Sequence, residues 1–244
     1  MKKIKYLFIM ILSLVVLAGC SIEPSVTVNS DGTVFEQVKF TVENKDVVLS
    51  NNELNNYFTN AIAPYSKVLS MRNYNYDVNT GKTTSNVVVY RKFSNLCEYI
   101  ENTIFTQYIY KQMSCDETKE YIEIKNVTPH IDYCSDCSDW PALKNVDFKI
   151  TLPVSAEEND ADNVDKTTYT WTYDMYTPSS KNFYLKINKN SLKEQEKIDI
   201  KKKKSDLRFK KIIKIISVIL GVSLILFLAY NYLLKKYKKN NIDY

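Results

Sequence analysis

The chain is poor in the residues on which common enzyme sites depend. Its 244 residues include only four Gly and a single His, His130. One histidine excludes multi-histidine metal centres within this chain and leaves a Ser–His–Asp triad only one possible base. A glycine-rich phosphate loop and a Gly-x-Ser-x-Gly motif are both absent from the sequence. We therefore expect a protein that is not an enzyme and needs no cofactor, in which His130 is structural.

Proline, internal repeats and low-complexity linkers are also scarce. The chain has six Pro, and no repeat or long linker divides its central part. About 180 residues lie between the two ends discussed next, enough for one domain with a hydrophobic core. We expect a single compact domain over residues 20–188.

The N-terminus has the pattern of a lipoprotein signal peptide. Lys2, Lys3 and Lys5 precede 13 mostly apolar residues, 6–18, and the small residues Ala18 and Gly19 lead directly to Cys20. This length is typical of a signal-peptide core and too short to span a membrane comfortably. We predict that residues 1–19 are removed and that Cys20 is lipidated. The alternative is an uncleaved N-terminal anchor with an incidental cysteine.

A second membrane signal lies near the other end. Residues 215–234 form an uncharged run of 20 residues, with Tyr230 and Tyr232 near one end. As a helix the run would be roughly 30 Å long, the thickness of the hydrocarbon core, and tyrosines favour the interface. We predict a transmembrane helix at 215–234, preceded by a basic, helical stalk at 189–214 and followed by a cytoplasmic tail at 235–244.

The charges around this span conflict with the topology that Cys20 implies. Eight Lys or Arg lie in 201–214, but only four lie in 235–239, so the positive-inside rule favours a cytoplasmic stalk. Lipidation of Cys20 requires the opposite, and we give it more weight because the first segment usually sets topology. Residues 20–200 have a net charge of −8 and residues 201–244 a net charge of +10. Beside a span, the basic cluster favours anionic lipid head groups over nucleic acid, and plain solvation is the alternative.

Alternation and turn residues indicate an α+β domain. Asp31-Gly32 between two alternating runs is a hairpin signal. We expect an antiparallel sheet of strand pairs with two helices on one face. The first helix spans 50–63, and the second begins at Ser94, with an inner face of Leu96, Tyr99, Ile100, Ile104 and Phe105. The expected strands are 25–29, 34–42, 67–78, 85–93, 106–113, 119–126, 145–152, 167–174 and 182–188.

Four further cysteines lie in the predicted exported region: Cys97, Cys115, Cys134 and Cys137. An even number outside the cell favours disulfides, and we favour Cys97–Cys115 and Cys134–Cys137 among the three possible connectivities. A four-thiolate zinc site is one alternative, because Cys134 and Cys137 have metal-ligand spacing. A redox-active Cys-x-x-Cys pair is another, although its acidic surroundings would raise a thiol pKa.

Two weaker patterns complete the set of candidate sites. A polar, acidic loop is expected at 155–166. Its carboxylates could bind calcium, but the segment lacks the turn glycine and the distal Glu of an EF-hand loop, so a solvated loop is the better interpretation. Its acidic residues are Glu157, Glu158, Asp160, Asp162 and Asp165. Ser217 and Gly221 form a small-xxx-small pair, a weak indication of helix association.

The chain resembles the LppM-like bacterial lipoproteins. The resemblance depends on Cys20, the hairpin at 26–42 with Asp31-Gly32, the strand at 168–171, the segment at 183–187 and the Lys-flanked C-terminal span. It implies a surface-exposed α+β domain that has no assigned enzymatic activity and is able to bind an amphipathic ligand. The four ectodomain cysteines are not part of the pattern, and it supplies no catalytic residues.

These observations predict a non-enzymatic lipoprotein of the bacterial cell membrane, with an extracellular domain and a short cytoplasmic tail. Its partners would be membrane lipid, through Cys20 acylation and the 215–234 helix, and an amphipathic ligand, envelope component or membrane protein, not nucleic acid. The alternatives are a structural subunit of a membrane complex and, less favoured, an envelope-acting hydrolase with acidic residues as acid and base.

Overall fold

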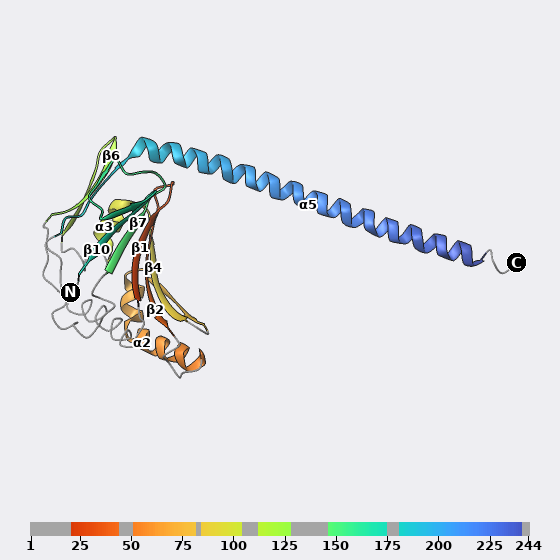
Figure 1. Cartoon of the computed structure of the whole chain (residues 1–244), viewed down its shortest axis with the longest axis horizontal. Helices are drawn as coiled ribbons and strands as arrows, with labels where there is room; N and C mark the ends of the chain where they lie inside the picture. The colour runs from red at the N-terminus through yellow and green to blue at the C-terminus, as the bar shows by residue number, and fades with distance from the viewer. Residues whose placement is uncertain are drawn as a thin grey trace. The chain divides into compact units, whose positions relative to one another are not determined.

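The computed structural model of the protein describes residues 21–43, 51–81, 84–103, 112–127, 146–174 and 181–240. The chain divides into two compact units, Met1–Gln195 and Glu196–Tyr244. Within the first unit, the described residues form an α+β fold with two sheets (Figure 1). The predicted α+β class is confirmed.

The larger sheet has seven strands in the order β3-β4-β2-β1-β7-β10-β9. All neighbours are antiparallel except β1 and β7, which are parallel. The strands are β1 (Ser21–Val28), β2 (Val34–Glu43), β3 (Asn75–Thr80), β4 (Thr84–Phe93), β7 (Val146–Thr151), β9 (Asn163–Asp165) and β10 (Thr168–Tyr173). The smaller sheet has the order β5-β6-β11-β8, formed by β5 (Met113–Glu117), β6 (Tyr121–Asn126), β11 (Tyr184–Asn188) and β8 (Glu158–Asn159).

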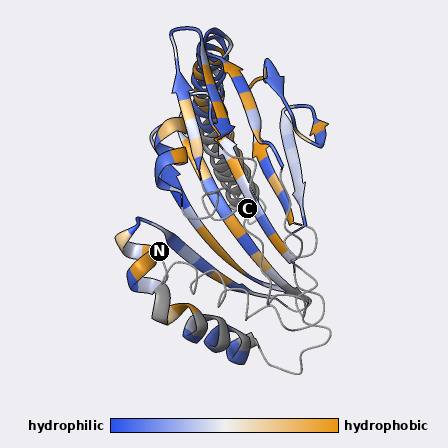
Figure 2. Ribbon diagram, turned by 90° about the vertical axis from the view of Figure 1, so that its left-hand side faces the viewer, coloured by the Kyte–Doolittle hydropathy of each residue, from blue (hydrophilic) through white to orange (hydrophobic). Residues whose placement is uncertain are grey.

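The strands of the large sheet bury one face, as their alternation requires. Figure 2 shows hydrophobic and hydrophilic residues alternating along them. The two sheets share a core in which aromatic rings meet. Trp171 of β10 lies with its ring centroid 4.4 Å from that of Phe183, which directly precedes β11, and Phe148 of β7 lies 6.0 Å from Phe183. All three side chains are at most 2% exposed.

The predicted hairpin is confirmed. Strands β1 and β2 pair from Ser21↔Thr41 to Val28↔Val34. Gly32 has φ +82°, a conformation that glycine adopts without steric cost. The carboxylate of Asp31 accepts hydrogen bonds from the backbone N–H of Thr33 at 3.0 Å and from its hydroxyl at 2.6 Å. This Asx turn fixes the reversal of the chain.

The first helix is longer than predicted. Helix α2 spans Asn51–Met71, so residues 67–71, predicted as strand, are helical, and the following strand β3 begins at Asn75. The helix ends in a Schellman motif, in which the N–H of Tyr74 donates to Leu69 O at 2.8 Å and the N–H of Asn73 donates to Ser70 O at 3.0 Å. Asn73 has φ 58°. The alternating pattern at 67–78 predicted a strand there, so the end of the helix at Met71 was not foreseen.

The expectation of one antiparallel sheet is wrong in two respects. The strands form two sheets, and the large sheet contains the parallel pair β1–β7. Strand β6 pairs with β11 across a long stretch of sequence, which no local pattern indicates. The prediction for 106–113 is also shifted, because β5 begins at Met113 and residues 106–111 lie outside the described part.

The predicted charged stalk is helical. Helix α5 spans Lys189–Asn240 and begins directly after β11. The Asn188 side chain caps it, since its carbonyl oxygen accepts from the N–H of Asn190 at 2.9 Å and of Ser191 at 3.3 Å. A search for helices apolar and long enough to cross a membrane found none among the described residues. Many side chains of 215–234 lie outside that description, as do residues 1–20, His130, Cys134, Cys137, Ile104 and Phe105.

Candidate functional site: a buried carboxyl on the inner face of the large sheet

Glu36 is the most unusual residue of the described core. It lies on β2 between Val34 and Val38 on the buried face, and it is 2% exposed. An isolated buried carboxylate is costly, because burial removes the hydration of the charge. Desolvation therefore raises the pKa of Glu36, to about 7, although its hydrogen bonds and a nearby arginine lower it.

Both carboxyl oxygens of Glu36 accept hydrogen bonds from hydroxyl groups. The Tyr74 hydroxyl donates to Oε2, and the Thr103 hydroxyl donates to Oε1. Tyr74 is carried into the core by the Schellman motif that ends α2, and it is 3% exposed. Thr103 follows the last residue of α3 (Leu96–Asn102), where its N–H donates to Tyr99 O at 2.8 Å. Two helix ends thus converge on one carboxyl.

Arg91 is the cation nearest to this cluster. It pairs directly opposite Glu36 on β4. Its guanidinium lies 4.2 Å from the ring centroid of Phe93 and 5.6 Å from that of Tyr74. Nη1 donates to Asn102 O at 3.3 Å, and Nη2 lies 3.6 Å from Glu98 Oε1. Its buried Nε has no hydrogen-bond partner among the described residues. The arginine therefore links the sheet to α3.

Helix α3 is fixed at its beginning as well. Asn95 caps it by accepting from the N–H of Glu98 at 2.8 Å, and the Glu98 carboxylate accepts from the N–H of Ser94 at 2.7 Å. This arrangement is a variant of the capping box, in which the Glu98 carboxylate bonds to the residue before the cap. The Ser94 hydrogen bonds lower the pKa of Glu98. Leu96, Tyr99 and Ile100 are buried, as predicted.

A disulfide joins α3 to the small sheet. Cys97 bonds to Cys115 of β5, with their Cα atoms 5.2 Å apart, which is the pairing favoured from the sequence. In this bond neither sulfur is a thiolate, which favours the disulfide interpretation over a four-thiolate zinc site. The pairing of Cys134 with Cys137 and the redox alternative stay predictions, since both residues lie outside the described part.

The acidic segment predicted as a loop connects the two sheets. It contains β8, which pairs with β11, and β9, which pairs with β10. Asp160 Oδ1 accepts from the Trp171 indole N–H at 2.9 Å and from the Tyr184 N–H at 2.7 Å. Asp162 accepts from the Thr172 N–H at 2.7 Å and from Lys181. These carboxylates bind protein donors, and the described residues contain no group of acidic, Cys or His side chains suited to a metal ion.

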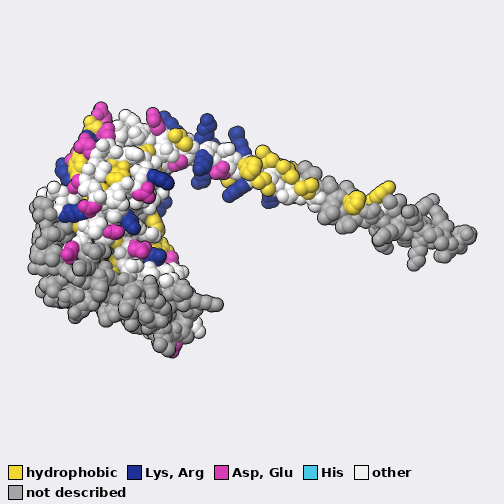
Figure 3. Space-filling model, in the orientation of Figure 1, with side chains coloured by type: hydrophobic (Ala, Val, Ile, Leu, Met, Phe, Trp, Pro, Cys, Tyr) yellow, Lys and Arg dark blue, Asp and Glu magenta, His cyan; other side chains and the backbone are white. Residues whose placement is uncertain are grey.

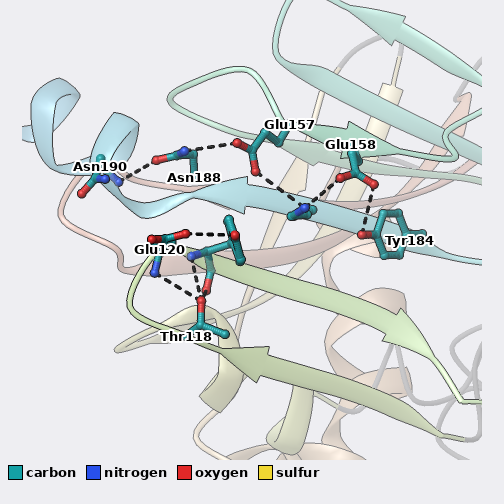
Figure 4. A network of polar contacts seen from close by, with 9 residues as sticks. Thr118, Glu120, Glu157, Glu158, Tyr184, Asn188 and Asn190 are labelled. Carbon is teal, nitrogen blue, oxygen red and sulfur yellow. Dashed lines mark hydrogen bonds and ion pairs between the residues drawn. The ribbon is translucent and has the colours of Figure 1, made fainter.

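Glu157 and Glu158 belong to a polar network on the small sheet (Figure 4). Lys186 of β11 lies between them, with Nζ 2.7 Å from Glu158 Oε1 and 3.9 Å from Glu157 Oε2. The same ammonium group lies 4.5 Å from the centroid of the Tyr121 ring. The Asn188 amide N–H donates to Glu157 Oε1 at 3.2 Å. The network connects β6, β8 and β11 to the cap of α5.

The chemistry open to the Glu36 cluster is the uptake and release of one proton near neutral pH. Both oxygens are occupied by hydroxyl donors, which suits a structural lock better than attack on a substrate. Neither Glu36 nor Arg91 was predicted from the sequence as a site residue. Each stands at an inward position of an apolar alternation, with Val34, Val38 and Phe40 in one strand and Val87, Val89 and Phe93 in the other, and that interruption was the available signal.

Comparison with known proteins returned little. No family model and no curated protein sequence matches the chain. A search of solved structures found similarity to the NMR structure of the folded domain of LppM from Mycobacterium tuberculosis. The TM-score is 0.41 at 11% sequence identity, and the match covers 69% of this chain and 89% of that chain.

Proposed function

We propose that this protein is a membrane-anchored surface lipoprotein whose folded domain is a non-enzymatic binding module. The observation that supports it best is the start of the fold. Strand β1 begins at Ser21, immediately after the predicted lipidated residue Cys20, and Ile22 is already buried. The predicted cut before Cys20 therefore leaves the whole of β1 in the mature chain. A cut further along the chain would remove part of β1.

The C-terminal end supports the same proposal. Helix α5 continues without interruption from the last strand through the basic stretch into the apolar residues 215–234. A span of this length and composition suits a bilayer. We propose that it is a transmembrane helix, that the domain is extracellular and that the short tail is cytoplasmic.

Processing at Cys20 is the first testable prediction. Intact-mass measurement of the wild-type protein from bacterial membranes should show loss of residues 1–19 and the added mass of diacylglycerol. Cys20→Ser removes the thiol that carries the lipid, so the full-length precursor should accumulate unmodified. Ser21→Ala is a matched control next to the same site and should be processed normally. If Cys20→Ser were still cut after residue 19 and carried the diacylglycerol mass, as expected for the wild type, the lipoprotein assignment would be contradicted.

Ligand binding by the domain is tested on the same preparation. We propose an amphipathic ligand, and mass spectrometry of molecules that co-purify with the washed full-length protein should identify one in stoichiometric amount. Membrane cross-linking distinguishes the alternative, a structural subunit, which would yield a defined partner protein and no small ligand. The envelope hydrolase is the least supported alternative, because the most unusual carboxyl, Glu36, is buried and engaged by two hydroxyl groups.

A further inference from the structure

The beginning of the second unit has two chemically distinct sides. Between Lys203 and Ile216 the α5 side chains are exposed wherever they are described. Four large apolar residues follow the spacing i, i+3, i+4, i+7, which places them on one side of a helix. They are Phe209, Ile212, Ile213 and Ile216, with exposed fractions of 64%, 53%, 48% and 50%. We call this set the apolar stripe.

The opposite side of the same turns is cationic. Lys203, Lys210 and Lys214 are seven and four residues apart, and Lys204, Arg208 and Lys211 follow at i, i+4 and i+7, so all six share the other side. Asp206 is the only acidic residue from 201 to 214. Figure 3 shows dark blue side chains along this part of α5, followed by exposed yellow ones. The combination of a cationic and an apolar side is typical of helices that bind anionic membrane surfaces.

The position along the helix fits the same surface. At about 1.5 Å per residue, Ile212 and Ile213 lie roughly 3–5 Å before Ile215, and Phe209 lies roughly 9 Å before it. The polar layer of a bilayer is roughly 5–8 Å thick on each side. If the span begins at Ile215, Lys210, Lys211 and Lys214 lie within this layer, and the Phe209 backbone lies just beyond its outer edge.

We infer that residues 203–216 are a recognition site for anionic phospholipids of the leaflet that faces the domain. Lys210, Lys211 and Lys214 contact phosphates, the apolar stripe enters the interface, and Lys203, Lys204 and Arg208 add attraction to the charged surface from further out. This inference rests on the proposed span at 215–234. It also accounts for the conflict noted in the sequence, because eight positive charges before the span oppose the proposed topology but serve lipid binding. Each such charge near an anionic surface is favourable.

The test measures the exposure of one position on each side of the helix. Phe209→Trp and Leu207→Trp are made separately in the full-length chain, since Leu207 lies on the cationic side, two residues away. Each variant is reconstituted into vesicles of phosphatidylcholine alone and into 70:30 phosphatidylcholine:phosphatidylglycerol. Acrylamide, an uncharged quencher, reports the exposure of the introduced tryptophan, and the wild-type chain corrects for Trp140 and Trp171.

We expect the quenching constant of Phe209→Trp to fall by at least about twofold with phosphatidylglycerol, and to recover at high salt, which screens the attraction. The constant of Leu207→Trp should change little. Adding Lys203→Gln, Lys204→Gln, Lys210→Gln and Lys211→Gln to Phe209→Trp should abolish the difference between the two lipids. Equal constants in both lipids would overturn the inference, as would protection that depends on protein concentration, which indicates a second copy of the chain.

Alkaline extraction of the same vesicles separates this result from the proposed function. A chain that is released was never inserted, and then the span itself is refuted. A chain that is retained but shows no dependence on phosphatidylglycerol refutes the lipid recognition alone.

Discussion

Glu36 shows how one residue couples the fold to pH. Its folded-state pKa is raised from 4.5 to about 7 by burial, so the folded protein holds a proton that the unfolded chain releases. The stability from this proton is fully present below pH 4.5 and is lost as the pH rises through about 7. A rise in pKa from 4.5 to about 7 corresponds to roughly 3 kcal/mol of unfolding free energy. The side chains of Arg91, Tyr74 and Thr103 each lower the pKa of this carboxyl, so they reduce the pH dependence that burial causes.

Glu36→Gln should therefore remove this pH dependence. The amide is neutral at every pH, so the unfolding free energy of the variant, relative to wild type, should rise by roughly 3 kcal/mol between pH 4.5 and 8. Urea unfolding of residues 21–195 at several pH values measures it. The comparison cancels Glu98, whose lowered pKa gives the opposite dependence. Tyr74→Phe removes one donor and should move the transition to higher pH, whereas parallel profiles for Glu36→Gln and wild type would contradict the assignment.

The Glu36 cluster also shows which part of a site the sequence can predict. Its position on an inward strand face follows from the alternation around it. Its partners do not, because Tyr74 and Thr103 are 38 and 67 residues away along the chain. They arrive at the ends of two helices, and the depth to which a helix end enters a core depends on packing that no local pattern encodes.

At the scale of elements, hydrophobic alternation located most strands, whereas turn chemistry marked where the chain reverses or a helix ends. Asp31-Gly32 predicted a hairpin that is present, and the strands at 85–93, 145–152, 167–174 and 182–188 agree with β4, β7, β10 and β11 within two residues. The stretch 67–78 reads as alternating, yet its first part is helical. The informative residue there is Asn73, because asparagine tolerates the left-handed conformation that ends a helix.

Asn73 gives a prediction about the end of α2. With φ 58°, Asn73→Ala should destabilise residues 21–195 by about 1 kcal/mol, while Asn73→Gly should be neutral or slightly stabilising, because only glycine has no steric cost in this conformation. Urea unfolding at fixed pH measures both. Arg72→Ala, at the exposed neighbouring position, should change the unfolding free energy by less than about 0.5 kcal/mol. Equal destabilisation by alanine and glycine would show that the Asn73 side chain, and not its backbone conformation, is what matters.

At the scale of the molecule, the second sheet was the feature that the sequence did not reveal. Nine strands were predicted in one sheet, whereas the described residues form eleven strands in two sheets. Alternation specifies a buried face and not the sheet to which it belongs. Among the described residues, the rings of Phe148, Trp171 and Phe183 and the acidic connector around Asp160 join the sheets directly. The Cys97–Cys115 disulfide joins them through α3, which Arg91 links to the large sheet. Only the disulfide could be inferred beforehand, from cysteine parity.

Asp160 is the point at which the connection between the sheets can be tested. Its Oδ1 accepts from Trp171 of the large sheet and from Tyr184 of the small one. Asp160→Ala leaves both donors without this acceptor, and one of them belongs to the fully buried Trp171. We expect a loss of about 2–3 kcal/mol in unfolding free energy, with a change in the near-ultraviolet circular dichroism of the tryptophan.

Two further variants show whether this loss comes from the bridge. Asp160→Asn retains an oxygen acceptor but not the charge, so it should lose less than half as much. Asp165→Ala lies in the same acidic connector, on exposed β9, and should stay within about 0.5 kcal/mol of wild type. If Asp160→Ala and Asp165→Ala were equally mild, the connector would be a solvated loop and the sheets would be held by the aromatic core and the disulfide alone. If only Asp160→Ala lowered the unfolding free energy, the Asp160 carboxylate would be the polar contact that connects the two sheets.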